Sequence, residues 1–433
     1  MVKTMTYKFI RSIAAIIMTI SCSSCDVLSL MGEQDGDIKN VMLLYSAGYN
    51  NLASYLKEDI KDLKEGWLPT RRRATDVVLV YSHFPQGGYN NPTHPTLVRL
   101  SRAKDGKVVC DTLVTYPKET VSSSAEQLNT VLTYIRDNYD SERYGMIFSS
   151  HATGYLPAGY YLNEDKVFTD DTAAGMSMRR SAARPVLYVE PEYDPSLPLT
   201  KSIGQDQVGT SGAYVSYEME LSEFASAIPM YLDYILFDAC LMGGVEVTYE
   251  LRDKVGKVGF SQAEVLAEGF CYGTLTSSLL TEAEPDVRKV CDDYFQQYDI
   301  QNGVYRSATI SLIDCGKMDS LAIVCNKLFD TYSEGISDVN YNKVQRFYRS
   351  GKHWFYDMES ILVNAGISET ELQELHAALD QCVLYKAHTP SFMSEFDIHT
   401  FCGFSMYLPN HGSERLSEFY KSLKWNQDTG LVR

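Results

Sequence analysis

Continuous apolar runs alternate with segments of helical periodicity along most of the chain. Residues 41–45 (VMLLY) and 77–81 (VVLVY) consist of apolar and aromatic residues only, which is typical of strands covered on both faces. Between these runs, apolar residues recur every three or four positions from Leu52 to Leu63, as they do on one face of a helix. This alternation predicts an α/β fold with a mostly parallel sheet and helices on both of its faces.

The same patterns continue towards the C-terminus and outline the organisation of the chain. They predict a hairpin at 96–116, helices at 122–139 and 241–254, and strands at 144–150, 234–240 and 257–264. Later helical and strand patterns occupy 287–298, 305–314, 318–332 and 403–409. The polar segment at about 163–212 predicts an excursion from the core, which could contain a small hairpin of its own. We therefore expect a core of residues 38–275 and a C-terminal elaboration, residues 276–433, packed on it.

The first residues are typical of an export signal rather than of a folded element. Three basic residues precede a short apolar stretch at 13–20, and serines then lead to a cysteine. The apolar stretch is too short to cross a bilayer as a permanent helix. The segment resembles the signal of bacterial lipoproteins. That resemblance implies that residues 1–24 are removed, that Cys25 (or else Cys22) carries a lipid, and that residues 25–37 tether an extracytoplasmic protein to the membrane. Plain secretion with a spare cysteine is the alternative.

Charge and cysteine pattern exclude several classes of partner. The formal net charge at pH 7 is −17 and no stretch forms a basic groove, so we expect no nucleic-acid partner. The chain has 10 cysteines but no CxxC motif outside the signal region, and its histidines show no metal-binding spacing. We therefore expect no metal site and no cofactor that the chemistry requires.

Cys240 and His151 each lie at the carboxyl end of a predicted strand. In a mostly parallel sheet these ends meet at one edge, where ligands bind. A cysteine acts as a nucleophile when an acid or base partner transfers its thiol proton. Backbone N–H groups must also face it, as they do at a strand-to-helix turn. Gly243 and Gly244 keep that turn open. Taken singly, each of the two residues is more often structural, and His83, at the end of another strand, is the rival histidine.

The segments around these residues resemble the clostripain family of cysteine peptidases, whose fold caspases, legumains and gingipains share. An apolar strand ends in His151, and a later one ends in Asp-Ala-Cys at 238–240, within FDACLMGGVEVTYELRD. The resemblance also includes VMLLYSAGYNNL at 41–52, FSQAEVLAEGFCYG at 260–273 and GFSMYLP at 403–409. It extends over about residues 38–430 and implies a caspase-like three-layer α/β/α sandwich with a mostly parallel sheet.

The resemblance implies the chemistry of a cysteine endopeptidase. The thiolate of Cys240 would attack a peptide carbonyl to form an acyl-enzyme, and His151 would donate a proton to the leaving amine. The backbone N–H groups of Cys240 and of a residue near Ala152 would hold the oxyanion. The family usually has glycine directly after this histidine, and alanine is costly there if the position needs a positive φ.

The resemblance also implies that Asp238 lines the primary specificity pocket. Residues two apart in a strand point to the same side, so Asp238 and Cys240 would share one side of the sheet edge. A carboxylate in the pocket favours cleavage after arginine or lysine. Glu264 and Glu268 are both candidates for a second pocket acid. The alternative is that Asp238 only bonds the backbone at the turn.

Two other properties of the family concern the excursion. Several members cut their own chain between the histidine and the cysteine, and Arg179, Arg180 and Arg184 are candidate cleavage sites, although ordinary surface arginines would give the same pattern. Some members respond to calcium as an activator. The acidic residues within 165–171 suit a hard cation, but their spacing matches no calcium loop.

We therefore expect a membrane-anchored, extracytoplasmic cysteine endopeptidase that acts on protein or peptide substrates. One rival is a catalytically silent scaffold or binding lipoprotein of the same fold, and a further rival is a glycan-binding surface lipoprotein. An active peptidase predicts that Cys240 and His151 face each other across an open cleft lined by Asp238. A scaffold predicts a plugged cleft or a buried thiol, and a glycan binder predicts an exposed aromatic platform.

Overall fold

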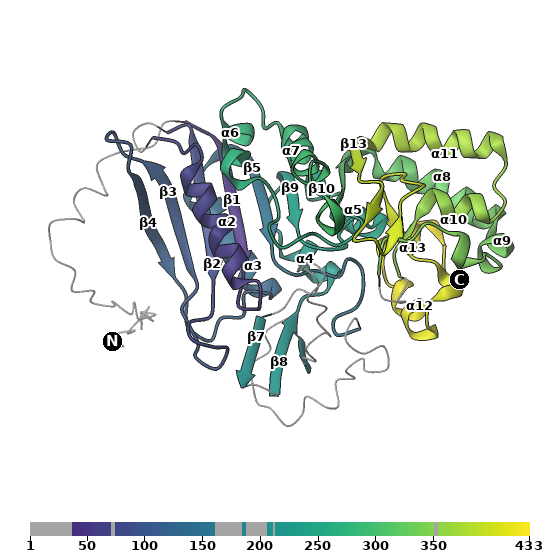
Figure 1. Cartoon of the computed structure of the whole chain (residues 1–433), viewed down its shortest axis with the longest axis horizontal. Helices are drawn as coiled ribbons and strands as arrows, with labels where there is room; N and C mark the ends of the chain where they lie inside the picture. The colour runs from purple at the N-terminus through teal and green to yellow at the C-terminus, as the bar shows by residue number, and fades with distance from the viewer. Residues whose placement is uncertain (1–36, 71–73, 161–183, 188–205, 211–212, 350–353) are drawn as a thin grey trace, which may run out of the picture.

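A nine-stranded sheet forms the centre of the molecule (Figure 1). The computed structural model describes residues 37–70, 74–160, 184–187, 206–210, 213–349 and 354–433. The order of the strands is β13-β11-β10-β9-β5-β1-β2-β3-β4; those from β10 to β2 run parallel, and antiparallel strands extend both ends. These strands are β1 (Ile38–Ala47), β2 (Asp76–His83), β3 (Thr96–Arg102), β4 (Val108–Thr115), β5 (Ser141–Ser149), β9 (Leu232–Asp238), β10 (Val255–Phe260), β11 (Thr309–Asp314) and β13 (Val383–His388).

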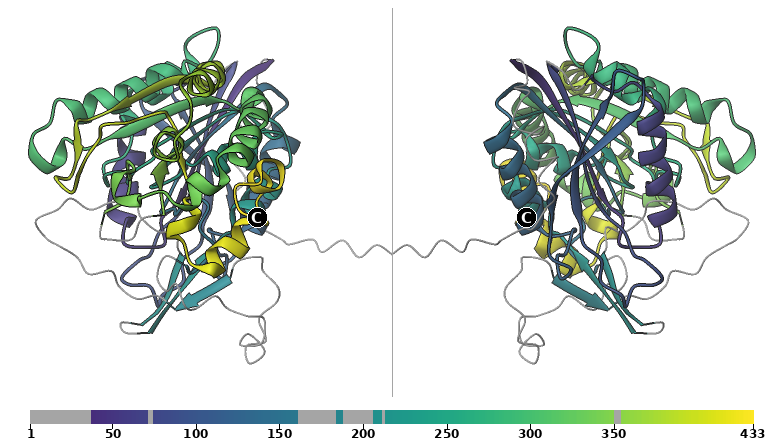
Figure 2. Two further views of the ribbon diagram at one scale, coloured as in Figure 1. Left: turned by 90° about the vertical axis from the view of Figure 1, so that its right-hand side faces the viewer. Right: turned by 90° about the vertical axis from the view of Figure 1, so that its left-hand side faces the viewer.

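Helices cover both faces of this sheet, as Figures 1 and 2 show. On one face α2 (Ala53–Glu65) contacts α6 (Tyr272–Leu280), which contacts α7 (Val287–Asp299). On the other face α3 (Ala125–Asn138) contacts α4 (Leu221–Ala227), which contacts α5 (Val245–Leu251). The predicted three-layer α/β/α sandwich with a mostly parallel sheet is therefore confirmed.

The apolar runs of the sequence correspond to the strands that are paired on both sides. β1 lies between β2 and β5, and every residue from Asn40 to Ala47 is buried. The helix predicted at 122–139 forms as α3, because Ser124 caps its N-terminus by accepting a hydrogen bond from the backbone N–H of Gln127 at 3.2 Å. The helical periodicity thus marked the buried face of α3, while the serine marked its first turn.

The C-terminal residues extend the same sheet through β11 and β13. The remaining helices are α8 (Met318–Thr331), α9 (Ser333–Ser337), α10 (Met358–Asn364), α11 (Glu369–Cys382), α12 (Glu414–Tyr420) and α13 (Lys424–Thr429). The short strands β12 (Tyr356–Asp357) and β16 (Ser405–Met406) pair with each other, as do β14 (Ser391–Phe392) and β15 (Phe396–Asp397). The strand pattern at 403–409 therefore yields only two paired residues, because Gly403 has a φ of 108° and a 3-10 turn begins at Pro409.

The excursion between β5 and β9 contains a small sheet with the order β6-β8-β7. Its strands are β6 (Arg184–Leu187), β7 (Asp206–Thr210) and β8 (Ala213–Glu218). The antiparallel pair of β7 and β8 confirms the expected hairpin and extends it beyond residue 212. Within the described ranges, no helix is long and apolar enough to cross a membrane.

Candidate active site

His151 and Cys240 follow two neighbouring strands of the sheet. β5 and β9 are parallel, and their last paired residues are Ser149 and Asp238. His151 lies two residues beyond Ser149, and Cys240 lies two residues beyond Asp238. The predicted meeting of these two segments at the carboxyl edge of the sheet is therefore confirmed.

The thiol of Cys240 is buried under the segment that follows β10. Its side chain has 0 % exposure, and Sγ accepts a hydrogen bond from the backbone N–H of Val265 at 3.0 Å. The thiol also lies 3.6 Å from the carbonyl oxygen of Val265, to which it donates. A buried thiol is the arrangement expected of a catalytically silent scaffold, whereas an active peptidase was expected to show an open cleft.

The turn after Cys240 is strained and is held by the same segment. Leu241 has a φ of 61°, a left-handed conformation that costs a residue with a side chain about 1–2 kcal/mol. Its backbone N–H donates to the carbonyl of Ala263 at 2.9 Å, and that of Gly243 donates to the carbonyl of Ser261 at 2.8 Å. These backbone bonds offset the strain and fix the path of the chain into α5.

The loop that carries His151 packs directly on this turn. Gly154 has a φ of 61°, and a Cβ placed on it would lie 2.5 Å from the carbonyl oxygen of Leu241. Only glycine allows so close an approach. Ala152, in contrast, is absent from the described residues that have a positive φ without being glycine, so alanine carries no such cost at that position.

The imidazole of His151 is buried, with 5 % exposure, and contacts the turn after β1. Its Nε2 lies 2.7 Å from Oδ1 of Asn51, a residue that the sequence interpretation did not single out. The signal was available in the Asn-Asn pair at 50–51, because asparagines after a buried strand are typical of a side-chain-stabilised turn. The pattern does not reveal which side chains the two asparagines contact.

Asp238 is fully buried and is held by two hydroxyl groups. Its Oδ2 accepts hydrogen bonds from Oγ of Ser149 at 2.9 Å and from the hydroxyl of Tyr272 at 2.6 Å. The carboxylate of Asp238 is therefore bonded by side chains from the end of β5 and the start of α6. Asp238 itself does not line the cavity described next, whereas Tyr272 does.

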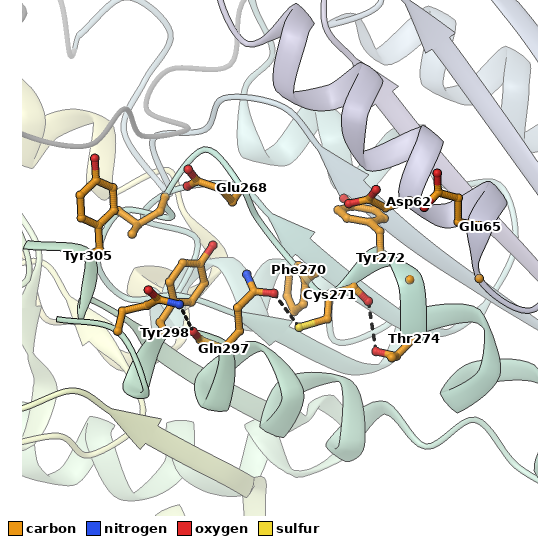
Figure 3. A pocket seen from close by; sticks show the side chains of 14 residues that line it. Asp62, Glu65, Glu268, Phe270, Cys271, Tyr272, Thr274, Gln297, Tyr298 and Tyr305 are labelled. Atoms are coloured by element: carbon orange, nitrogen blue, oxygen red, sulfur yellow. Dashed lines mark hydrogen bonds between the residues drawn. The ribbon is translucent and has the colours of Figure 1, made fainter.

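A cavity of about 650 Å³ opens between α2, α7 and the segment before α6 (Figure 3). Of the residues that the structure describes, three exposed carboxylates line it, namely Asp62, Glu65 and Glu268, and no lysine or arginine does. The other lining residues are Gly66, Leu266, Phe270, Cys271, Tyr272, Gly273, Thr274, Gln297, Tyr298, Gln301 and Tyr305. The cavity is thus acidic, with aromatic walls, and suits a cationic side chain with an apolar stem.

The two candidate acids after β10 have different surroundings. Glu268 is exposed and lines the cavity. Glu264 is buried and forms a two-pronged ion pair, with its oxygens 2.6 Å from Nε and 3.2 Å from Nη2 of Arg349. Of the two, Glu268 is the one placed to meet a ligand in this cavity.

The rival histidine, His83, belongs to a separate buried cluster. Its Nδ1 lies 2.8 Å from Oγ of Ser122 and 3.9 Å from Oδ2 of Asp206, which also accepts from the backbone N–H of Ser122. Burial lowers the pKa of His83 to about 4 and raises the pKa of Asp206 to about 7. Both side chains serve to dock β7 of the excursion on the core.

Several expected features lie outside the described residues. These are the signal with Cys22 and Cys25, the tether up to residue 36, Arg179, Arg180 and the acidic residues within 165–171. Arg184 is the first residue of β6, where it pairs with Glu218 of β8. Among the described residues, no group of three or more His, Cys, Asp or Glu side chains is placed to hold a metal ion.

Comparisons with known proteins agree with this fold. The model of a family described as the clostripain family matches residues 44–194 and 189–429. A solved structure of an inactive zymogen C11 protease from Parabacteroides distasonis is 24 % identical, with a TM-score of 0.70 over 92 % of this chain and 99 % of that one. A secreted C11 cysteine protease from Bacteroides thetaiotaomicron, in complex with an irreversible peptide inhibitor, is 20 % identical, with a TM-score of 0.68 over 90 % and 99 %. Among curated proteins, none matches the chain.

Proposed function

Because the chain belongs to the clostripain family of cysteine peptidases, we propose that Cys240 and His151 are its catalytic pair and that it cleaves after arginine or lysine. The observation that carries the proposal is the register of β5 and β9, which delivers both residues to one edge of the sheet. Neighbouring parallel strands place such side chains within reach of one substrate bond.

In the proposed reaction Cys240 gives its thiol proton to His151, and its sulfur attacks the carbonyl carbon of the scissile bond. The oxyanion that forms is held by the backbone N–H of Cys240 and by one near Ala152. The C–N bond then breaks, and the amine leaves with a proton from His151. A water molecule hydrolyses the thioester, His151 takes up its proton, and the acid product departs as the thiol is restored.

The buried thiol requires a step before this chemistry. Cys240 accepts a hydrogen bond from Val265 and has no exposed surface, so a substrate carbonyl cannot reach it as the chain stands. We place the opening step in the excursion between His151 and Cys240, with cleavage after Arg179, Arg180 or Arg184 as its trigger. The loop of Gly154, which precedes the excursion along the chain, packs on the nucleophile turn.

The acidic cavity supports the proposed basic specificity. Glu268 would pair with the substrate cation, and Asp62 and Glu65 add to the negative field around it. Asp238 would contribute through Tyr272, which bonds its carboxylate and forms part of the cavity wall. Calcium remains in the proposal only as an activator.

The place of action that we propose is outside the cytoplasm, with a lipid on Cys25 or else on Cys22. The proposed substrates are proteins or peptides. The net charge of −17 disfavours nucleic acid as a partner. Radioactive palmitate incorporation in a bacterial host, compared between the native chain and Cys25→Ala and Cys22→Ala variants, tests the anchor and identifies the modified cysteine.

One assay tests the catalytic proposal. Residues 26–433 and the matching Cys240→Ala protein are incubated with Arg-, Lys- and apolar-ending fluorogenic peptides while chain cleavage is followed on a gel. We expect turnover of the basic peptides by the native protein only. Turnover that survives in Cys240→Ala would overturn the assignment of the nucleophile, and preference for apolar peptides would overturn the specificity.

The buried thiol also favours a second candidate, a catalytically silent scaffold of the same fold. The two candidates separate when the folded protein is first cut in its excursion by a small amount of trypsin, with calcium present. Once the trypsin has been inactivated with a serine-protease inhibitor, a peptidase turns over peptides and loses the free thiol of Cys240 to a peptide chloromethyl ketone. A scaffold does neither.

A further inference from the structure

The ring of His151 contacts a side chain from the turn that follows β1. Nε2 lies 2.7 Å from Oδ1 of Asn51, the typical length of a strong N–H···O hydrogen bond. Asn51 stands in the turn between β1 and α2, and β1 is the neighbour of β5 on the side opposite β9. The histidine therefore lies between the segment of the nucleophile and the turn of Asn51.

Hydrogen bonds of Asn50, the residue before Asn51, hold this turn in place. Asn50 is fully buried, its Nδ2 donates to the carbonyl of Ala47 at 3.1 Å, and its Oδ1 accepts from the backbone N–H of Leu52 at 3.0 Å. The carbonyl of Ala47 also accepts a hydrogen bond from Oγ of Ser150 at 2.8 Å. Asn50 thus builds the turn, Ser150 ties it to the histidine segment, and the exposed Asn51 is left to meet the ring of His151.

The chemistry of the contact determines the tautomer of the ring. An amide oxygen only accepts hydrogen bonds, so the nitrogen that faces it must carry a proton. In the neutral ring Nε2 then bears the hydrogen, and Nδ1 is the basic nitrogen. When the ring is protonated, the same oxygen accepts a stronger, charge-assisted bond and stabilises the cation.

We propose that Asn51 is the positioning residue of the active site, which holds His151 as the Nε2–H tautomer so that Nδ1 exchanges the proton with the thiol and the leaving amine. The inference rests on the proposed role of His151 in catalysis. It adds a third member, from a third strand segment, to the pair that the sequence pattern indicated. Asn51 does not touch the reacting atoms and acts through the ring.

Enzyme kinetics provide the first test, with three variants of residues 26–433. Asn51→Ala removes the acceptor, and Asn51→Asp keeps an oxygen in place and adds a negative charge. Asn138→Ala is the matched control, because Asn138 is also exposed and its side chain donates to a carbonyl of its own helix, that of Tyr134. The profile of kcat/KM against pH is measured for each protein with an Arg-ending peptide.

We expect Asn51→Ala to lower kcat by about 10- to 100-fold with little change in KM, since general acid–base catalysis contributes about 100-fold or more. We expect Asn51→Asp to recover much of this loss and to move the limb of the profile that reports His151 to higher pH, because a carboxylate favours the charged ring. Thermal midpoints should match that of Asn138→Ala. Native kinetics in Asn51→Ala, or a loss that follows unfolding, would overturn the proposal.

A second measurement keeps the inference testable if the protein has no peptidase activity. Nitrogen chemical shifts of His151, measured in the Cys240→Ala protein with and without Asn51→Ala, report the tautomer directly. Predominant Nε2–H that is lost in Asn51→Ala supports the positioning role even if no peptide is cleaved. A ring that is Nδ1–H, or that is the same in both proteins, overturns the role whatever the activity. The failure of the proposed function and the failure of this inference thus give different results.

Discussion

Ser149 and Asp238 lie opposite each other in neighbouring parallel strands, and the hydroxyl of Ser149 donates to the carboxylate of Asp238 at 2.9 Å. This bond joins the ends of β5 and β9 at the last residues before the candidate catalytic segments. Tyr272 closes the arrangement from α6, with its hydroxyl 2.6 Å from the same oxygen. A buried carboxylate with these partners ties both strand ends to the wall of the acidic cavity.

Tyr272→Phe removes one of these donors and leaves the ring in place. Because Asp238 is fully buried, we expect the free energy of unfolding to fall by about 1–3 kcal/mol. Urea unfolding measures the change. Tyr305→Phe is the matched control, since Tyr305 lines the same cavity but is 52 % exposed, and it should stay within about 0.5 kcal/mol of the native value. Equal effects of the two changes would contradict the structural role of the Tyr272 hydroxyl.

Gly154→Ala should damage the site by forcing the histidine loop away from the nucleophile turn. The added Cβ would lie 2.5 Å from the carbonyl oxygen of Leu241, and the φ of 61° strains any side chain. Gly106→Ala separates the two causes, because Gly106 has a φ of 83° and no atom within 4 Å of the added Cβ. We expect a loss of about 1 kcal/mol in Gly106→Ala and a larger loss in Gly154→Ala. Peptidase activity should fall only in Gly154→Ala, as initial rates would show.

Glu268→Gln should weaken the preference for basic peptides. The carboxylate of Glu268 is exposed, so its pairing with a substrate cation contributes about 1 kcal/mol, and kcat/KM for Arg- and Lys-ending peptides should fall about fivefold. Apolar-ending peptides should be unaffected. Glu282→Gln is the control, because Glu282 is also exposed but does not line the cavity. An equal fall for all peptides would show that Glu268 does not select charge.

Three buried carboxyl groups make stability depend on pH. Burial raises the pKa of Asp206 to about 7, that of Glu246 to about 7 and that of Asp357 to about 6. Between about pH 4 and about pH 7 the folded chain therefore holds protons that the unfolded chain releases, so the free energy of unfolding falls as pH rises through this window. Burial lowers the pKa of His83 to about 4, so between about pH 4 and the usual histidine pKa of about 6.5 this residue makes the free energy of unfolding rise with pH.

Thermal unfolding across this window measures the balance, and Asp206→Asn identifies one source. The amide oxygen of asparagine still accepts from the backbone N–H groups of Ser122 and Ser123, whereas its side chain does not ionise. We expect a shallower decline of the midpoint between about pH 4 and about pH 7 in Asp206→Asn than in the native protein. The exposed Asp105→Asn should leave the decline unchanged. A decline as steep in Asp206→Asn as in the native chain would exclude Asp206 as its source.

Much of the architecture was determined by local patterns in the sequence. The all-apolar stretch of β1 follows from pairing on both of its sides, and the periodicity of α3 with its capping serine follows from burial of one helix face. The alternation of strand and helix then places residues 151 and 240 at the same edge, because parallel strands share their direction. The family resemblance of the segment at 237–253 added the chemistry.

Only the tertiary structure decided which side chains meet at that edge. Glu264 and Glu268 are four residues apart in one loop, yet Glu264 forms an ion pair with Arg349 whereas Glu268 lines the cavity. The contact of Asn51 with His151, and the burial of the Cys240 thiol against Val265, likewise join segments far apart in the sequence. Periodicity reports which face of an element is buried, whereas the partner of a polar group depends on the packing of elements from elsewhere in the chain.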